Sequence, residues 1–195
     1  MAKAVLISIR PEWVSRILGG EKTLEVRKTR PKLEAPFKCY IYCTKGRKPW
    51  VLDGFPGIRQ DGNVVAEFTC EKIDIIWRRG IPQNFDYCYL SLNEWGNDDI
   101  ETEIRDIRES CIPKEKLNAY AGKAPVLYAW HISNLEIYDT PKELPQFRKC
   151  CGTQDCDKCQ FWENTGEYAG CLTSEERRLN RPPQSWCYVE ELNNG

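Results

Sequence analysis

A short string near the start of the chain, Gly20–Arg27 (GEKTLEVR), constrains the fold more than any other feature. Before it, the apolar residues of Pro11–Leu18 recur at helical spacing and a proline occupies the first turn, which predicts a short amphipathic helix. Gly19 and Gly20 then stop the helix. After them Thr23–Lys28 alternates between apolar and polar residues, which predicts a strand. The string therefore marks a turn from a helix into a strand.

The polar residues of this turn indicate a polar ligand. Alternate residues of a strand lie about 6.5 to 7 Å apart on one face, so Glu25 and Arg27 can grip one ligand or each other. We expect Lys22 at the mouth of the turn, where its ammonium can reach a phosphate or a carbonyl as a mobile point charge. The competing interpretation is a solvated strand edge with a surface Glu–Arg pair, worth about 0 to 1 kcal/mol.

From Ala4 to about Tyr138 the chain resembles the ASCH family, a branch of the PUA-like superfamily. That family's signature Gly-x-Lys-x-x-Glu-x-Arg is matched here by Gly20, Lys22, Glu25 and Arg27. Strand-like segments around the signature fit the order of such domains, at residues 5–9, 38–44, 62–76 and 127–138. The resemblance implies an α+β fold built on a small β-barrel, with helices at its rim and a cleft lined by the signature. It also implies RNA or nucleotide binding in that cleft.

Two enzymes related to this family define an alternative. One is an amidohydrolase acting on N4-acetylcytidine, whose turn reads Gly-x-Lys-Thr-x-Thr-x-Arg, with the lysine and the second threonine catalytic. Glu25 stands where that threonine would be, and a carboxylate cannot act as a hydroxyl nucleophile, although it could serve as a general base beside Lys22. The other is a metal-dependent ribonuclease, in which Lys22, Glu25 and Arg27 would assist phosphoryl transfer. Binding is the favoured prediction, and hydrolysis using Lys22 and Glu25 is the alternative.

The charge balance limits how such a protein can attract nucleic acid. The 28 Lys and Arg residues face 29 Asp and Glu residues, so the net charge of −1 gives no global attraction. Binding must therefore come from a local patch, and the first 50 residues carry a basic run of Lys22, Arg27, Lys28, Arg30, Lys32, Lys45, Arg47 and Lys48. The alternative for this run is an ordinary solvated face. We expect RNA or a modified nucleotide as the partner, with DNA as a second candidate.

Further candidates for the cleft lie near this basic run. Thr44 and Lys45, at the end of the predicted strand 38–44, are weaker candidates for ligand binding. Aromatic residues beside the run could stack on bases or could equally belong to the core; they are Tyr40, Tyr42, Trp50 and Phe55. His131, the single histidine, is expected to be a satisfied core or rim residue rather than a catalytic base.

Cysteine usage is the second informative feature, because six of the 11 cysteines lie between residues 150 and 195. Cys156 and Cys159 form a Cys-x-x-Cys pair, Cys151 precedes it and Cys171 follows it. Four thiolates at such spacing suit a structural, tetrahedral zinc site, whose metal would supply folding energy to this segment. Cys150 competes with Cys151 as the first ligand, and we favour Cys151.

Three other states of these cysteines remain alternatives to zinc. The first is unliganded thiols. The second is disulfides, which need an oxidising compartment. The third is an iron–sulfur cluster, although the spacing of these cysteines matches no ferredoxin pattern. A protein-interaction adaptor that works through the cysteine-rich segment is a third functional hypothesis. The remaining cysteines are expected to be small buried hydrophobes; they are Cys39, Cys43, Cys70, Cys88 and Cys111.

The predicted organisation is a barrel domain over residues 1–140, with a helical insertion at 78–124, followed by a cysteine-rich segment at 141–195. Within the insertion we expect helices at Leu90–Glu94, Ile100–Ile107 and Pro113–Tyr120. After the barrel we expect a brief helical linker at Thr140–Pro145 and a returning strand within Pro182–Glu190. The late cysteines and the segment Arg181–Val189 resemble ASCH proteins carried by phages and prophages. No apolar run is long enough for a signal peptide or a spanning helix, so the sequence predicts a cytoplasmic protein without membrane association.

Overall fold

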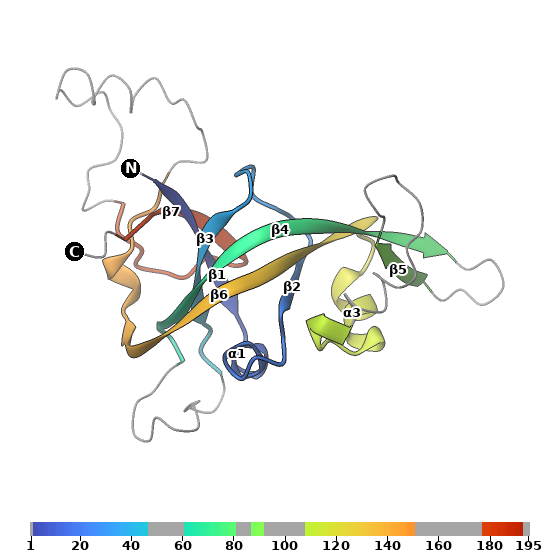
Figure 1. Cartoon of the computed structure of the whole chain (residues 1–195), viewed down its shortest axis with the longest axis horizontal. Coiled ribbons are helices and arrows are strands. Elements are labelled where there is room, and N and C mark those ends of the chain that lie inside the picture. Colours follow the sequence, from blue (N-terminus) through green and yellow to red (C-terminus); the bar gives the residue numbers. More distant parts are fainter. Residues whose placement is uncertain (1, 47–60, 81–86, 92–107, 151–176, 193–195) are drawn as a thin grey trace, which may run out of the picture. The chain divides into compact units, whose positions relative to one another are not determined.

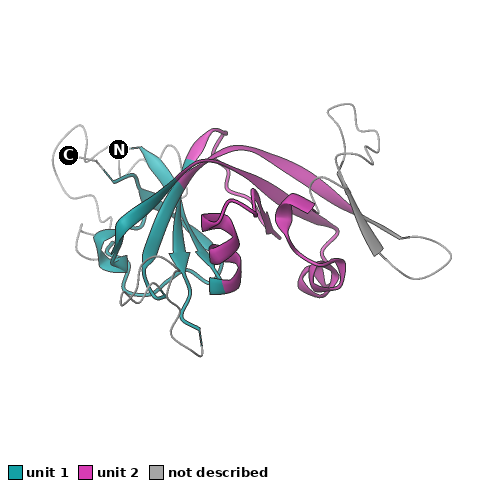
Figure 2. Cartoon of the chain, turned by 60° about the horizontal axis from the view of Figure 1, so that its bottom comes forward, with its two compact units in different colours: residues 1–11, 38–67, 136–195 teal, residues 12–37, 68–135 magenta. Residues whose placement is uncertain are grey.

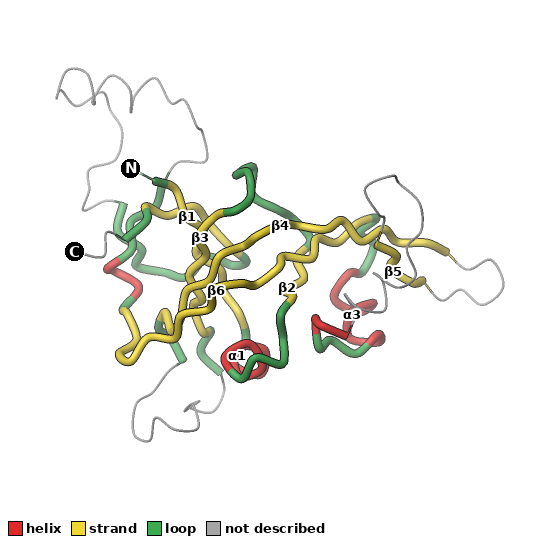
Figure 3. Tube along the Cα trace, viewed as in Figure 1, coloured by secondary structure: helices red, strands yellow, loops and turns green. Residues whose placement is uncertain are grey.

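The computed structural model describes residues 2–46, 61–80, 87–91, 108–150 and 177–192 of the chain (Figure 1). These residues form strands with a few short helices (Figure 3). In chain order the elements are β1 (Lys3–Ile9), α1 (Pro11–Leu18), β2 (Leu24–Arg27), β3 (Phe37–Cys43), β4 (Val64–Gly80), β5 (Tyr87–Ser91), α3 (Lys114–Ala121), β6 (Val126–Lys142), the 3-10 helix η1 (Leu144–Gln146) and β7 (Trp186–Glu190).

The strands form one mixed sheet in the order β2-β6-β4-β3-β1-β7, and β5 pairs with β4. Strand β1 runs parallel to β3, with Val5 opposite Cys39, and antiparallel to β7, with Val5 opposite Tyr188. The predicted α+β class is confirmed. The predicted closed barrel is not, because within the described residues β2 and β7 end the hydrogen-bonded order and do not pair with each other.

The chain divides into two compact units, each assembled from separate stretches of sequence (Figure 2). Unit 1 contains residues 1–11, 38–67 and 136–195, and unit 2 contains residues 12–37 and 68–135. Each unit has its own cluster of buried apolar side chains. In unit 1 the cluster includes Ala4, Leu6, Tyr40, Tyr42, Val64, Phe147 and Val189. In unit 2 it consists of Leu24, Val26, Ile76, Leu117, Ala121, Leu127 and Ala129.

The helix-to-strand turn forms largely as its sequence predicts. Helix α1 spans Pro11–Leu18 and buries Val14 and Ile17. Gly20 has a φ of +75°, a left-handed conformation that glycine adopts without steric cost, and its N–H donates to the Ile17 carbonyl at 3.0 Å. Strand β2 then follows, but all four of its residues are buried. The competing interpretation of a solvated strand edge is therefore wrong, because the polar side chains of β2 are buried as well as the apolar ones.

Several other predicted elements can be compared with the structure. Helix α3 is confirmed, with Pro113 as its N-cap residue. The helical linker predicted at Thr140–Pro145 is wrong in its first half, because β6 continues to Lys142 before the 3-10 helix begins. Leu90 and Ser91 lie in strand β5 rather than in a helix. The predicted helix Ile100–Ile107 lies outside the described residues, and the predicted domain boundary at residue 140 stays a prediction.

Unit 1 contains a polar network that we term the Glu67 latch, formed by Lys38, Glu67, Tyr138 and Glu191. Lys38 Nζ lies 2.8 Å from Glu67 Oε1 and 3.4 Å from Glu191 Oε1. The Tyr138 hydroxyl donates to Glu67 Oε2. The latch thus joins β3, β4 and β6 to the chain that follows β7. Among the described residues, no helix is long and apolar enough to cross a membrane.

Candidate ligand-binding cluster

Three ionised side chains from the helix-to-strand turn contact one another in unit 2, and we term them the Lys22 cluster. Glu25 lies between two cations: its Oε2 is 3.3 Å from Lys22 Nζ and its Oε1 is 3.0 Å from Arg27 Nη2. The side chains of Lys22, Glu25 and Arg27 are only 0%, 8% and 10% exposed. The predicted Glu–Arg pair is therefore present, but it is buried rather than a solvated surface pair.

Lys22 is fixed at the base of this cluster. Besides its contact with Glu25, Nζ donates to the Leu24 carbonyl at 2.5 Å and to the Ser110 carbonyl at 2.7 Å. The three ammonium protons thus face three acceptors. Burial lowers the pKa of Lys22, and the Glu25 carboxylate opposes that shift. The prediction of a mobile cation at the mouth of the turn is wrong, because the side chain turns inward and holds the backbone.

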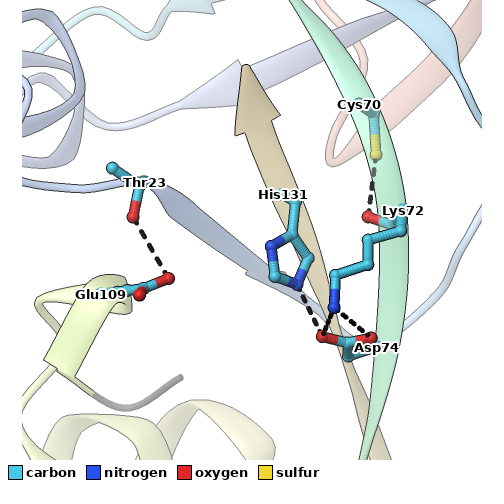
Figure 4. A network of polar contacts seen from close by, with 6 residues as sticks. All are labelled: Thr23, Cys70, Lys72, Asp74, Glu109 and His131. Atoms are coloured by element: carbon cyan, nitrogen blue, oxygen red, sulfur yellow. Dashed lines mark hydrogen bonds and ion pairs between the residues drawn. The ribbon is translucent and has the colours of Figure 1, made fainter. Parts of the chain in front are cut away.

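The segment before α3 holds the turn from the other side. The Thr23 N–H donates to the Glu109 carbonyl at 3.1 Å, and the Thr23 hydroxyl donates to Glu109 Oε2 at 3.4 Å (Figure 4). Cys111 Sγ donates to the Glu21 carbonyl at 3.2 Å. Glu109 and Ser110 are absent from the sequence-based site, since no local motif links them to a turn more than 80 residues earlier.

Partly exposed aromatic side chains surround the Lys22 cluster, and each has a cation over its ring. We term these three residues, Trp13, Tyr120 and Tyr128, the aromatic rim. Lys116 Nζ lies 5.4 Å from the centroid of the Trp13 ring, and Lys28 Nζ lies 5.1 Å from that of Tyr120. The guanidinium carbon of Arg30 lies 5.7 Å from the centroid of the Tyr128 ring. All three cationic residues are exposed. The rim therefore combines flat apolar faces with positive charge.

Each rim residue is also linked to the cluster. The Trp13 ring lies 5.7 Å from Lys22 Nζ. Tyr128 is the cross-strand partner of Arg27 in the β2–β6 ladder, so the two side chains leave the same face of the sheet. Burial raises the pKa of Tyr120 and the Arg27 charge opposes that rise, which places the phenol within electrostatic range of the cluster. Tyr120 is still 39% exposed and thus accessible to a ligand.

The charges of the Lys22 cluster suit an anion. Two cations and one carboxylate leave one positive charge among side chains that are almost fully buried. Taking a net charge out of water is costly, and an anionic group brought close to it would offset part of that cost. The adjacent rim cations, of which Lys28 follows β2 directly, add positive charge on the accessible side.

Two further predicted ligand residues, Thr44 and Lys45, lie in unit 1 rather than with the cluster in unit 2. The Thr44 N–H donates to the Ile9 carbonyl at 2.8 Å. The stem of Lys45 lies across Gly62, where an added Cβ would come within 2.7 Å of Lys45 Cε. A shared role with the Lys22 cluster stays a prediction for both residues. Other candidates from the basic run lie outside the described residues; they are Arg47, Lys48, Trp50 and Phe55.

The aromatic and cysteine candidates of unit 1 belong to its core. Tyr40 and Tyr42 are buried there, which confirms the core alternative over base stacking. Cys39 and Cys43 of unit 1 and Cys70 of unit 2 are buried and form no disulfide, which confirms the prediction of small buried residues. Burial raises the pKa of Cys43 and of Cys70 to about 12. Both thiols therefore stay protonated at neutral pH.

The proposed zinc ligands cannot be placed, because Cys151, Cys156, Cys159 and Cys171 lie outside the described residues. In the part of the chain that is described, no group of three or more His, Cys, Asp and Glu side chains is arranged to hold a metal ion. Cys111 is half-buried, and nothing is described of the Cys88 side chain. The zinc site stays a prediction.

His131 is partly buried and hydrogen-bonded, as predicted for a satisfied histidine. Its Nε2 lies 2.6 Å from Asp74 Oδ2, and Lys72 Nζ lies 3.0 Å from the same oxygen (Figure 4). Burial would raise the pKa of Asp74, but the hydrogen bonds from His131 and Lys72 outweigh it and lower that pKa. No sequence pattern indicates Lys72 and Asp74, because they are brought to His131 only by the pairing of β4 with β6, two strands that are far apart in the sequence.

Comparison with solved structures identifies the fold. The crystal structure of ASCH from Zymomonas mobilis is similar over 96% of this chain and 88% of that chain, with 17% identity and a TM-score of 0.52. The chain has the ASCH fold. A serine-to-alanine mutant of the same Zymomonas protein is similar over 96% of this chain and 89% of its own, with 16% identity and a TM-score of 0.53. No protein-family model matches the chain, and no curated protein matches its sequence.

The ASCH fold confirms the resemblance drawn from the Gly20–Arg27 signature. A tyrosine-to-phenylalanine mutant of the Zymomonas protein gives the same result, with 18% identity, a TM-score of 0.52 and coverage of 97% of this chain and 92% of that chain. The similarity at these identities concerns the fold. The function is argued below from the residues of this chain.

Proposed function

We propose that the protein binds RNA or a nucleotide, with or without a modified base, at the Lys22 cluster and the aromatic rim. The observation that carries this proposal is a buried cluster with surplus positive charge, Lys22–Glu25–Arg27, bordered by accessible aromatic rings that each carry a cation. Nucleotides offer the two complementary features, an anionic phosphate and a flat base.

The aromatic rim supplies the surface for bases. Single-stranded RNA is commonly bound by stacking its bases on aromatic side chains and Arg guanidinium planes. Each stacked base contributes about 1–3 kcal/mol and is tolerant of sequence, because every base has a π-face. Tyr120 is the most accessible rim residue. The ammonium of Lys28, which lies over the Tyr120 ring, would contact the phosphate of a base stacked there.

The residues of the Lys22 cluster take different roles in this proposal. Lys22 is a positioning residue, since its Nζ is directed at Leu24, Ser110 and Glu25 within the protein. Glu25 orients Arg27 through the 3.0 Å contact. Arg27 is the cluster residue that lies opposite a rim residue in the β2–β6 ladder, because its partner there is Tyr128. This arrangement differs from direct phosphate contact by Lys22, the role that the sequence suggests.

Binding is favoured over hydrolysis by the same contacts. A general base must lie within hydrogen-bond reach of the proton that it removes, and the Glu25 side chain is only 8% exposed. Here Glu25 directs one oxygen at Lys22 and the other at Arg27, and Lys22 directs Nζ at two backbone carbonyls. The hydrolase remains the outcome to be separated from binding by experiment.

The proposal is tested by incubating labelled single-stranded RNA with the wild-type protein and with an Arg27→Gln and a Tyr120→Ala variant. Native and denaturing gels are run side by side, with and without added divalent metal. We expect shifted but intact RNA with the wild type, and a weaker shift with both variants; Tyr120→Ala should cost about 1–3 kcal/mol of binding free energy. Lys123→Gln, which changes an exposed lysine of unit 2, is the matched control.

The gels also separate the rival functions. Shortened RNA that disappears with Arg27→Gln would identify a nuclease. An unchanged shift with both Arg27→Gln and Tyr120→Ala would move the binding surface away from the Lys22 cluster. Absence of any shift or cleavage with wild-type protein would reject binding of this RNA and direct attention to free modified nucleosides or to the adaptor hypothesis.

A further inference from the structure

A second basic feature lies in unit 2, in the chain that follows β2. Arg30, Lys32 and Lys72 line an open hollow of about 630 Å³, together with Glu34, Pro31 and Ile73. We term it the basic hollow. Its lining has three cations and one carboxylate, and all three cationic residues are exposed. The basic hollow contains no residue of the Lys22 cluster, so it is a separate feature.

Arg30 connects the basic hollow to the aromatic rim. Its guanidinium carbon lies 5.7 Å from the centroid of the Tyr128 ring, while the same residue lines the hollow. Tyr128 is in turn the ladder partner of Arg27. Positive charge therefore continues from Arg27 through Arg30 to Lys32 and Lys72, with an aromatic face beside its middle section.

Lys72 is held in place by Asp74 on the same strand. Its Nζ lies 3.3 Å from Asp74 Oδ1 and 3.0 Å from Oδ2, and Oδ2 also accepts the 2.6 Å contact from His131 (Figure 4). Asp74 therefore contacts both Lys72 and His131. The carboxylate thus fixes the direction of Lys72, and the lysine side chain remains 54% exposed toward solvent.

We infer that the basic hollow binds the sugar–phosphate backbone of single-stranded RNA that leaves the aromatic rim, so that the ligand is a polynucleotide rather than a free nucleotide. This inference rests on the proposed function. A free nucleotide has a single sugar–phosphate unit, whereas a strand bound at the rim would also bring phosphates to Lys32 and Lys72 in the basic hollow. Proteins that bind single strands combine stacking residues with a positively charged groove along the backbone, over about 4–16 nucleotides.

The aromatic rim also decides between RNA and an acidic protein segment as the occupant. Lysines alone would attract either polyanion. The cation-bearing ring of Tyr128 beside the hollow offers a stacking face, which a nucleic-acid base uses and an acidic side chain does not. We therefore assign the hollow to RNA.

The test uses the full chain and fluorescence anisotropy with two labelled uridine RNAs, one of about 12 nucleotides and one of about 3 nucleotides. We expect the wild type to bind the longer RNA more tightly. Lys32→Gln combined with Lys72→Gln should weaken the longer RNA about tenfold and leave the shorter one unchanged. It should also lower the steepness of log affinity against log salt by about 1.4, which is about 0.7 for each lost phosphate contact.

Matched variants control for folding and for general charge. Lys114→Gln with Lys123→Gln removes two exposed lysines of unit 2 outside the hollow and should bind both RNAs like the wild type. Lys32→Arg with Lys72→Arg keeps the charge and should restore affinity and salt dependence.

The outcomes separate this inference from the proposed function. If the wild type binds both RNAs and the double Gln variant keeps wild-type affinity and salt dependence for the longer one, the basic hollow plays no part and the proposed function stands. If polyglutamate displaces the longer RNA at equal charge concentration, the hollow serves acidic proteins and the inference fails. If the wild type binds neither RNA, the inference and the RNA-binding form of the proposed function both fail, and only the binding of a free nucleotide is left to test.

Discussion

The Lys22 cluster of unit 2 and the Glu67 latch of unit 1 are both buried ionic networks, yet they differ in charge and in surroundings. In the latch, Glu67 is matched by Lys38 at 2.8 Å and by the Tyr138 hydroxyl, and Lys142 lies 4.2 Å from the Tyr138 ring centroid. When Lys142, which lies beside the latch, is counted with Lys38, two cations face the two carboxylates Glu67 and Glu191. The Lys22 cluster instead holds two cations and one carboxylate.

The aromatic side chains beside the two networks also differ in their burial. Beside the latch, Tyr40 and Phe147 are completely buried and their ring centroids lie 5.0 Å apart. Beside the Lys22 cluster, Tyr120 and Tyr128 keep accessible faces with cations above them. A balanced network closed by core aromatics stabilises the fold. A network with surplus charge next to open aromatic faces fits a ligand, and substitutions should separate these two roles.

The largest effect is expected from Lys22→Met. This change removes the donor from the Leu24 and Ser110 carbonyls and leaves Glu25 with one cation fewer in a buried place. Breaking a buried ionic network by removing one partner costs about 3–5 kcal/mol, so the free energy of unfolding in urea should fall by that amount and RNA binding should be lost. A cost similar to that of Lys123→Met would contradict the fixed role of Lys22.

A smaller loss of stability is expected from Tyr138→Phe in the latch. The change leaves one buried oxygen of Glu67 without its hydroxyl donor, which costs about 1–3 kcal/mol. RNA affinity measured by anisotropy should remain that of the wild type, because the latch is balanced in charge and closed. A marked loss of RNA affinity in a folded Tyr138→Phe protein would remove the distinction between the two networks.

The two networks should also respond oppositely to alkaline pH. The hydrogen bond to Glu67 raises the pKa of Lys38, so its contribution is complete below about 10.5 and is lost as pH rises through the raised value. Burial lowers the pKa of Lys22, so between that lowered value and about 10.5 the unfolded state binds more protons and stability rises with pH.

Urea unfolding in a reducing buffer from about pH 8 to 11 measures this contrast. The cost of Lys22→Met should grow with pH below about 10.5, and the cost of Lys38→Met should decline above it. Parallel pH profiles for the two variants would show that the two lysines occupy equivalent electrostatic environments.

The smallest effect on RNA binding is expected from the cysteine-rich segment. We propose that Cys151, Cys156, Cys159 and Cys171 hold one structural zinc. Cys156→Ser combined with Cys159→Ser should abolish the zinc content measured by mass spectrometry of metals, while a folded variant should keep its RNA affinity. Loss of RNA binding together with zinc, in a protein with an intact Lys22 cluster, would transfer the function to the cysteine-rich segment.

Local patterns predicted the elements well, because spacing alone specifies them. The stripe of Pro11–Leu18 gave α1 with the observed bounds, and the strand predicted at 127–138 lies within β6. The environment of those elements was less predictable. The alternation at Thr23–Lys28 predicts an apolar face and a polar face and leaves open whether the polar face is solvated, whereas all four residues of β2 are buried.

Long-range pairing explains what the sequence did not show. The sequence predicts a mobile cation at Lys22, since nothing in its own turn indicates that the Ser110 carbonyl, 88 residues away, accepts a hydrogen bond from Nζ. Asp74 and His131 are likewise joined across 57 residues. The residue types of the site were therefore recognisable from the signature, while their roles depended on contacts that only the fold supplies.

The central claim is that RNA binds at the Lys22 cluster and the aromatic rim of unit 2, and photocrosslinking tests it most directly. RNA containing 4-thiouridine is irradiated with the wild-type protein, and the crosslinked peptides are identified by mass spectrometry. Crosslinks to Trp13, Tyr120 or Tyr128, reduced in Arg27→Gln, are the predicted result. Crosslinks confined to residues 38–46 and 61–67 of unit 1 or to the cysteine-rich segment would contradict the account.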